Sequence, residues 1–315
     1  MDQVLMIGPA SAGKTCYLSA LEHAAHRTFL EASPFRCRLH KQNDGLRDLC
    51  LRGRQIIREG RLDQKIDAST SVSDYSFEFV CQPNPDDGGW SQFKRLLFGA
   101  QERQMQFHFL DGPGGALLPT RRGLDDDGDE NQYESFRENL IAHARRAQAL
   151  IVCADAYNLQ LAAAFFEHLP KLLGQIASEG CLPFRRVVVL LTKAEMLVVQ
   201  EGRGALEKLV SYSAWHHARQ LLSTSLGSLL AHLDDSTEMA CGWASAYGFI
   251  DGEGSANYDP QTGGLRTFDP NYPQMLTEGW RPLRVLDPLI YLTTGAHNSM
   301  QVFKKPALLK YLTSR

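Results

Sequence analysis

The stretch that decides the fold is GPASAGKTCYLSAL, Gly8 to Leu21, which directly follows the short apolar run QVLMI at Gln3 to Ile7. The apolar run has the length of a buried strand and stops at a glycine, whereas apolar residues recur at helical spacing from Leu18 onward. The sequence therefore predicts a strand, a loop and a helix in succession. The loop fits the pattern GxxxxGK[ST], which in this context is typical of a loop that binds nucleotide phosphates.

The residues of this loop suit a phosphate chain. Gly8 and Gly13 keep side chains out of the way, so that backbone N–H groups turn toward the phosphates, and the helix N-terminus adds partial positive charge. Lys14 would reach the terminal phosphates, and the Thr15 hydroxyl would ligate Mg²⁺. A glycine turn with a chance lysine is the alternative. The expected phosphate-binding residues are Gly8, Ser11, Ala12, Gly13, Lys14, Thr15 and Cys16.

A second motif, DGPGG at Asp111 to Gly115, follows the apolar residues FHFL. Asp111 at a strand end would hold Mg²⁺ through water, a role that many ATPases share. Gly114 falls three residues later, where a backbone N–H can sense the γ-phosphate of a nucleotide and order the following loop. This spacing favours a GTPase. A simple Gly-Pro turn is the alternative.

The sequence TKAE, Thr192 to Glu195, ends the apolar run VVVLL and resembles the [NT]KxD motif of GTPases. A carboxylate there accepts two hydrogen bonds from guanine that adenine cannot supply, while the lysine stem, here that of Lys193, covers the base. Glu195 keeps the charge of the usual aspartate and adds one methylene. Ser245 and Ala246 follow the last expected strand and resemble the SA turn whose backbone meets the guanine oxygen. A surface lysine and glutamate at a strand end are the alternative.

The switch region is expected between the first helix and the strand that precedes DGPGG. Thr70 would complete the Mg²⁺ shell in the triphosphate state, with Ser69, Ser71 and Ser73 as rivals. Gly115 stands where Ras-type switches carry the glutamine that orients the attacking water, so we expect slow intrinsic hydrolysis or a catalytic residue supplied from elsewhere. The expected catalytic residues are Lys14, Thr70 and Gly114, and the expected metal ligands are Thr15, Thr70 and Asp111.

Composition sets the class of protein and of partner. The 315 residues are 43% hydrophobic and 22% charged with a net charge of −3, which indicates a globular chain and gives no bulk electrostatic reason to expect nucleic acid or an anionic membrane as a partner. Seven scattered cysteines, none in a CxxC pair, argue against a disulfide framework and a zinc site. The apolar runs are strand-sized and the N-terminus lacks a signal pattern. A cytoplasmic protein without a membrane span is expected.

Apolar strands alternate with helical patterns along the rest of the chain. This alternation predicts one α/β domain over residues 1–315, a Ras-like P-loop fold with a mainly parallel sheet and helices on both faces. The two strands before DGPGG are expected to be antiparallel neighbours. Strands are expected at 3–7, 75–80, 105–111, 149–155, 187–191 and 239–244, helices at 18–29, 46–57, 136–147, 162–176, 206–230, 285–292 and 308–312, and insertions at about 33–62, 82–100 and 251–280.

Taken together, GPASAGKTCYLSAL, DGPGG, TKAE and the late segment WRPLRVLDPLIYL resemble the TRAFAC-class GTPase domains of prokaryotes called double-GTPase-like, found in conflict and defence loci. The resemblance covers most of the chain and departs from the GTPase pattern at Glu195 and Gly115. It implies a Ras-like fold that binds GTP or GDP with Mg²⁺ and whose nucleotide state gates a partner protein, either an effector or a GTPase regulator. A P-loop ATPase or kinase, and a pseudo-GTPase that binds nucleotide without turnover, are the alternatives.

Overall fold

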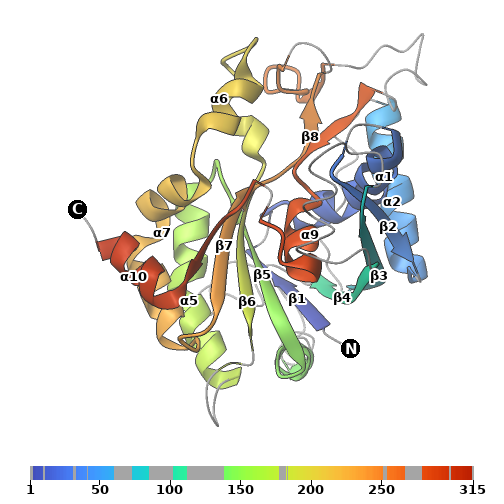
Figure 1. The fold of residues 1–315 in the computed structure, drawn as a ribbon. Coiled ribbons are helices and arrows are strands. Elements are labelled where there is room, and N and C mark those ends of the chain that lie inside the picture. Colours follow the sequence, from blue (N-terminus) through green and yellow to red (C-terminus); the bar gives the residue numbers. More distant parts are fainter. Residues whose placement is uncertain are drawn as a thin grey trace, which may run out of the picture.

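A computed structural model shows the arrangement of the elements (Figure 1). It describes residues 3–9, 11–30, 33–40, 42–59, 73–84, 102–111, 138–176, 182, 184–250, 254–266, 279–297 and 299–313. The predicted α/β class is confirmed, with a mainly parallel sheet and helices on both of its faces.

The main sheet has eight strands in the order β12-β7-β6-β5-β1-β4-β3-β2. The five strands from β7 to β4 run parallel, whereas β3, β2 and β12 join antiparallel to their neighbours. The expected antiparallel pairing of the two strands before DGPGG is therefore confirmed. The strand bounds are β1 Gln3–Ile7, β2 Phe35–His40, β3 Ser73–Pro83, β4 Arg103–Asp111, β5 Ala147–Asp155, β6 Arg186–Thr192, β7 Glu238–Trp243 and β12 Gln301–Lys304.

Helices cover the sheet on both faces because its central strands are apolar on both sides. In β5, Leu150 and Val152 point into one core and Ile151 and Cys153 into the other. Helices α5, α7 and α10 pack on the first face, while α1, α2 and α9 lie on the opposite face (Figure 1). The helix bounds are α1 Lys14–Leu30, α2 Asp44–Glu59, α5 Leu159–Ile176, α6 Ala205–Ser211, α7 Ala214–Ala231, α9 Asp287–Thr294 and α10 Lys305–Thr313.

Several expected boundaries are wrong. The long helix predicted over 206–230 is two helices, because Tyr212 is extended and the Ser213 hydroxyl accepts from the His216 N–H to begin α7. The helix predicted to reach Ala147 covers residues 138–144 of the described chain, and Ala147 begins β5. The insertion expected at 33–62 contains an unpredicted strand, β2, before the predicted helix α2.

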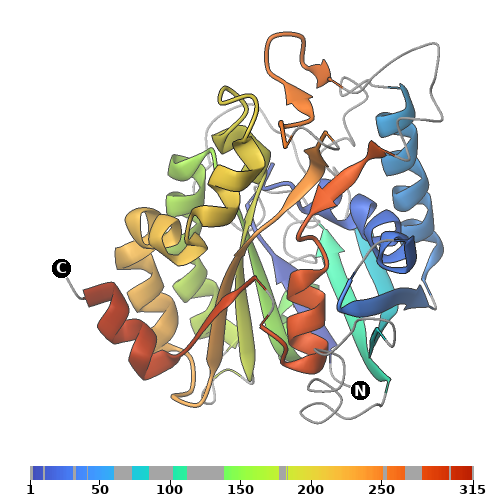
Figure 2. The same ribbon diagram turned by 45° about the horizontal axis from the view of Figure 1, so that its top comes forward.

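The segment 239–244 is also not the last strand. It is followed by β8 Ser245–Phe249, β9 Tyr258–Asp259, β10 Gly264–Leu265, β11 Arg281–Leu283 and β12. Strands β8 and β11 form a small antiparallel sheet, and β9 and β10 form a hairpin beside it at the upper end of the molecule (Figure 2). The parallel strands finish at this upper end, so β8 to β11 lie beside the loops that follow the parallel strands.

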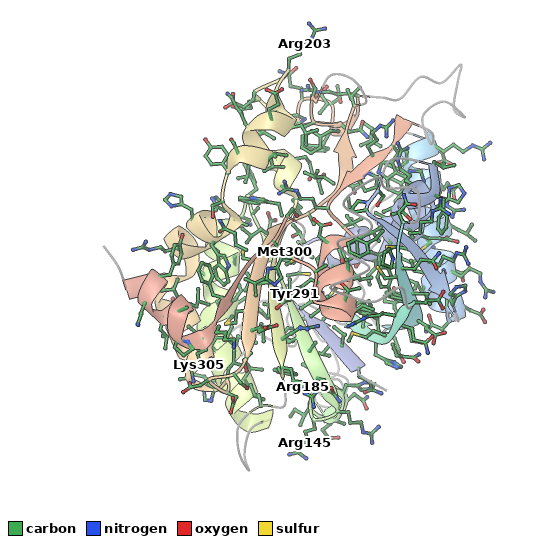
Figure 3. The ribbon with its side chains drawn as sticks, in the orientation of Figure 1. Arg145, Arg185, Arg203, Tyr291, Met300 and Lys305 are labelled. Atoms are coloured by element: carbon green, nitrogen blue, oxygen red, sulfur yellow. The ribbon has the colours of Figure 1, made fainter. Side chains whose placement is uncertain are left out.

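The residues labelled in Figure 3 show where the two ends of the sheet lie. Arg145 and Arg185, which precede β5 and β6, lie at the lower end, whereas Arg203 lies at the upper end. Tyr291 and Met300 lie near the middle, where they belong to the core between the sheet and α9. None of the helices in the described ranges combines the length and the apolar character that crossing a lipid bilayer requires.

Candidate functional site

The phosphate loop follows β1 and leads into α1, as its sequence predicts. Gly8 lies against β5, where a Cβ atom would come within 2.6 Å of the Cys153 carbonyl oxygen. Ser11 and Gly13 have φ angles of 58° and 74°, in the left-handed region that glycine adopts without strain. The loop closes with a hydrogen bond of 3.3 Å from Ala12 N–H to the Pro9 carbonyl. These glycines are thus required by close packing at Gly8 and by backbone geometry at Gly13.

Lys14 begins α1 and its side chain is buried against the loop. Its Nζ donates to the carbonyl oxygens of Gly8 and Pro9 at 3.0 and 2.9 Å. The ammonium group therefore lies over the loop, at the helix N-terminus where partial positive charge favours an anion. A phosphate placed there would meet both the cation and the backbone N–H groups.

The TKAE segment lies directly beside this loop. The Thr192 hydroxyl is within hydrogen-bond distance of the carbonyl oxygens of Ala12 and Ala154. A Cβ atom on Gly13 would be 3.5 Å from Lys193 Cγ. The end of β6 is thereby joined to the phosphate loop, so the structure brings together two motifs that are about 180 residues apart in the sequence.

Lys193 is held by a residue that the sequence did not single out. Its Nζ forms an ion pair of 2.6 Å with Asp155 Oδ2 at the end of β5, and the side chain of Asp155 is only 4% exposed. The other oxygen, Oδ1, accepts from the N–H groups of Tyr157 and Asn158 at 2.9 and 3.0 Å. Asp155 thus caps the turn before α5 and fixes the lysine stem. The signal in the sequence is an aspartate that ends the buried run ALIVCAD and precedes a helix.

Lys193 also has a left-handed backbone, with φ of 54° and ψ of 36°, where it begins the short 3-10 helix η1 Ala194–Leu197. This conformation costs a non-glycine residue about 1 kcal/mol and recurs at functional sites. It turns the chain sharply after β6. Glu195 follows within the turn.

Glu195 is the most unusual residue of the region because its carboxylate is buried, with 2% of the residue exposed. Burial raises the pKa of Glu195 to about 7, against the opposing effects of the Ser245 hydroxyl and the Lys193 ammonium. Among the described residues, no donor reaches its Oε2 atom. A buried carboxylate oxygen without a partner is costly, so this atom is suited to receive a hydrogen bond from a ligand.

Ser245 and Ala246 also lie beside this turn, but they begin strand β8 and do not form the expected turn after a last strand. The preceding residue, Ala244, accepts a 3.2 Å hydrogen bond from Ala194 N–H and donates one of 2.8 Å to the Leu191 carbonyl. Ser245 is fully buried, and its hydroxyl accepts from Gly248 N–H at 2.8 Å. From here the chain enters the small antiparallel sheet of β8 and β11.

The expected metal and switch residues are described only in part. Thr15 lies in the first turn of α1, next to Lys14, and Asp111 is the last residue of β4, beside β1. Their backbone positions bring a hydroxyl and a carboxylate residue to the same edge of the sheet, a donor set that suits Mg²⁺. Thr70, Gly114 and Gly115 lie outside the described residues.

No protein-family model matches the sequence, and no curated protein matches it. Two similar solved structures are those of the S. cerevisiae Ski7 GTPase-like domain, one bound to GDP and inorganic phosphate and one bound to GTP. Identity is 12% in both, over 82% and 88% of this chain, with TM-scores of 0.36 and 0.37. The chain spans 46% and 49% of those solved chains, about half of their length. Likeness this distant assigns neither a family nor an activity to the chain.

Proposed function

We propose that this chain is a guanine-nucleotide switch that binds GTP and GDP with Mg²⁺, hydrolyses GTP slowly and gates a partner protein through its nucleotide state. The observation that carries the proposal is Glu195, a buried carboxylate with one oxygen that meets no donor among the described residues. Because this residue lies beside the phosphate loop through Thr192 and Lys193, a nucleotide would reach both from one position.

The choice of guanine follows from the hydrogen-bonding groups of the bases. Guanine presents the N1–H and N2–H donors side by side, and an ionised carboxylate accepts both. Adenine has an acceptor at N1 and no amino group at C2, so it would give no donor to the buried Oε2 atom of Glu195. A site built around such a pair rejects a ligand that lacks the matching groups far more strongly than a shape difference alone would.

The phosphates would lie at the start of α1, where the loop N–H groups and Lys14 supply positive charge. Thr15, Thr70 and Asp111 would hold Mg²⁺, which neutralises charge on the transferring phosphoryl group when it is bound. Lys14 would leave the carbonyl groups of Gly8 and Pro9 to meet the phosphate oxygens. The binding energy would be used to order the loops that contain Thr70 and Gly114.

Slow hydrolysis is proposed because Gly115 stands where a water-orienting glutamine is usual. A partner would then set the rate or respond to the bound state. The resemblance to prokaryotic double-GTPase-like proteins supports an effector or a GTPase regulator as that partner, with a role in defence.

Parallel titrations of GTP and ATP, each with Mg²⁺, test this function. The wild-type protein should prefer GTP by roughly 100-fold or more, and Glu195→Ala should lose most of that preference. Glu201→Ala is the matched control, since Glu201 is an exposed glutamate paired with Lys208 on the surface. Equal or tighter binding of ATP, together with a silent Glu195→Ala substitution, would contradict the proposal. Phosphate release from GTP then separates a slow GTPase from a protein that only binds nucleotide.

A further inference from the structure

Two cysteines lie side by side where β2 and β3 pair at the edge of the main sheet (Figure 1). Cys37 of β2 and Cys81 of β3 are directly opposite each other in the strand register, and their Sγ atoms are 3.8 Å apart. Both side chains are buried, and both cysteines are free thiols. The proposed nucleotide site uses neither of them.

The backbone geometry of this pair suits a covalent bond between the two sulfur atoms. Asn84 N–H donates across the strands to the Pro34 carbonyl at 3.0 Å. Cys37 N–H instead points away from β3 and donates to the Thr28 hydroxyl of α1 at 2.9 Å. Bonded and non-bonded positions alternate along antiparallel strands, so Cys37 and Cys81 form a non-hydrogen-bonded pair, in which the Cα atoms are about 4.5 Å apart. A disulfide spans about 4.4 to 6.8 Å between Cα atoms, so the two sulfurs can join with little movement of the backbone.

The position of β2 gives an oxidant a route to the buried thiols. β2 is the outermost strand of the sheet, so among the described strands it pairs with β3 alone. A segment held on one side opens locally at a lower free energy than the whole protein unfolds. While the strand is closed, the hydrogen bond from the Cys37 thiol to Cys81 and the burial of Cys37 raise the pKa of Cys37 well above its ordinary value. The reactive thiolate therefore forms when β2 opens.

We infer that Cys37 and Cys81 are a site of reversible disulfide formation, with a low-molecular-weight disulfide such as oxidised glutathione as the oxidant. One cysteine thiolate attacks a sulfur of the oxidant and displaces a small thiolate, which takes up the proton that the cysteine released. The second cysteine thiolate then attacks the sulfur of the first, which forms the Cys37–Cys81 bond and displaces the other small thiolate. The protein loses two protons and two electrons, and the oxidant becomes two thiols.

The bond would stabilise the edge of the sheet. Cys37 and Cys81 are 44 positions apart, and a cross-link that closes so long a loop restricts the unfolded chain strongly. It would tie β2 to β3, while the bond from Cys37 N–H to Thr28 ties β2 to α1, the helix that follows the phosphate loop. Oxidation would therefore oppose the opening of β2.

Peptide mapping of the reduced full-length chain, before and after treatment with oxidised glutathione at pH 8, tests this site. Alkylation of the remaining thiols in urea should fall about tenfold at Cys37 and Cys81, a linked pair of peptides should appear, and dithiothreitol should reverse both changes. Alkylation of Cys50 should not change, because this buried thiol lies 3.7 Å from the Leu18 carbonyl and has no cysteine opposite it in a strand. The urea midpoint of the oxidised protein should rise by roughly 0.5 to 1 M.

Two variants separate the bond from a general effect of oxidation. Cys81→Ala leaves Cys37 without its partner, so oxidised glutathione should give at most a mixed disulfide and no rise in the urea midpoint. Cys50→Ala is the matched control, since it removes a buried thiol from the same core and keeps the pair. This control should oxidise as wild type does.

Three results would overturn the inference. Equal alkylation of Cys37 and Cys81 before and after treatment would show that no bond forms, and a bond that forms only in urea that unfolds the protein would show that the native strands do not allow it. A lower urea midpoint for the oxidised protein would show that the bond distorts the sheet. If Cys81→Ala does not fold, the peptide map and the midpoints of the wild-type protein decide. None of these measurements uses a nucleotide, so they stand apart from the proposed function.

Discussion

At the phosphate end of the candidate site, Lys14 Nζ already has two carbonyl partners, whereas at the base end no donor among the described residues reaches Glu195 Oε2. A phosphate must therefore compete with interactions that the protein makes with itself. A guanine edge would instead supply the donor that none of the described residues gives to Glu195 Oε2. We therefore expect the loop to provide affinity for any nucleotide and the turn after β6 to provide selectivity for guanine. Substitutions in the loop should lower the affinity for GTP and ATP alike, whereas substitutions in the turn should change the ratio of the two affinities.

The largest effect is expected at the phosphate end. Lys14→Ala should weaken GTP binding about 10²- to 10³-fold, because truncating a buried charge that meets a phosphate costs several kcal/mol. The ratio of GTP to ATP affinity should not change, since both nucleotides carry the same phosphates. Calorimetric titration measures both quantities, with the exposed Lys208→Ala as control. Binding of GTP within about threefold of wild type would place the phosphates elsewhere.

The next effect is expected at the base end, and it is a gain in the stability of the ligand-free protein. Burial gives Glu195 a pKa of about 7 where 4.5 is usual, so the folded protein holds a proton that the unfolded chain has released between these values. Stability therefore falls as the pH rises through this window, and the full cost is present at pH 8. Glu195→Gln should stabilise the ligand-free protein there by about 2 to 3 kcal/mol.

Urea unfolding at pH 8 and at pH 4.5 measures this gain. The stability difference between Glu195→Gln and wild type should shrink to a few tenths of a kcal/mol at the lower pH, where the carboxyl group is protonated in the folded chain and about half protonated in the unfolded chain. A variant that is less stable than wild type at pH 8 would show that the ionised carboxylate is well satisfied, and the contrast between the two ends would disappear.

A change of similar size but opposite sign, a loss of stability, is expected from crowding the loop. Gly8→Ala places a Cβ atom 2.6 Å from the Cys153 carbonyl oxygen, and the forced shift of β5 should cost about 2 kcal/mol. Gly279→Ala is the control, because no described atom lies within 4 Å of its Cβ position. Midpoints of urea unfolding compare the two. Equal midpoints for Gly8→Ala and Gly279→Ala would mean that the loop does not pack on β5 as described.

The smallest effect separates the two roles of Asp155. Asp155→Asn keeps a good cap for the turn before α5 and removes the charge that holds Lys193, so GTP affinity should fall about threefold to tenfold with little change in stability. Asp155→Ala loses the cap as well and should cost about 1 kcal/mol more in unfolding. If both variants bind GTP as wild type does, the ion pair has no part in positioning the lysine stem.

The phosphate end could be predicted from the sequence, and the base end only in part. Local signals are sufficient for β1, the loop and α1, because an apolar run, two glycines and helical spacing act within about 20 residues. Asp155 could have been found as a carboxylate at the end of a buried strand. The contact between Cys37 and Cys81 could not, since they are 44 positions apart and only the tertiary fold joins them.

The errors in the element boundaries have similar causes. Strand β2 is an edge strand whose sequence, FRCRLH, alternates apolar and basic residues, with Phe35 and Cys37 buried. Its arginines are typical of an exposed edge and weaken the apolar signal by which a strand is recognised. The later strands β8 to β11 are two to five residues long, which is too short for a periodic signal. Strand β8 pairs with β11 and β9 pairs with β10, and the sequence pattern does not indicate these pairings. For these reasons the sequence pattern wrongly predicts that β7 is the last strand.

The central claim is that the Glu195 carboxylate accepts hydrogen bonds from guanine. Its most direct test is the number of protons released when GDP binds. Calorimetry at pH 7 in two buffers of different ionisation enthalpy gives this number. With a pKa of about 7, wild type should release about half a proton more than Glu195→Gln, because guanine binds only the ionised carboxylate. The same proton release from both proteins would contradict the account, since Glu195 would then be ionised before binding or would not contact the base.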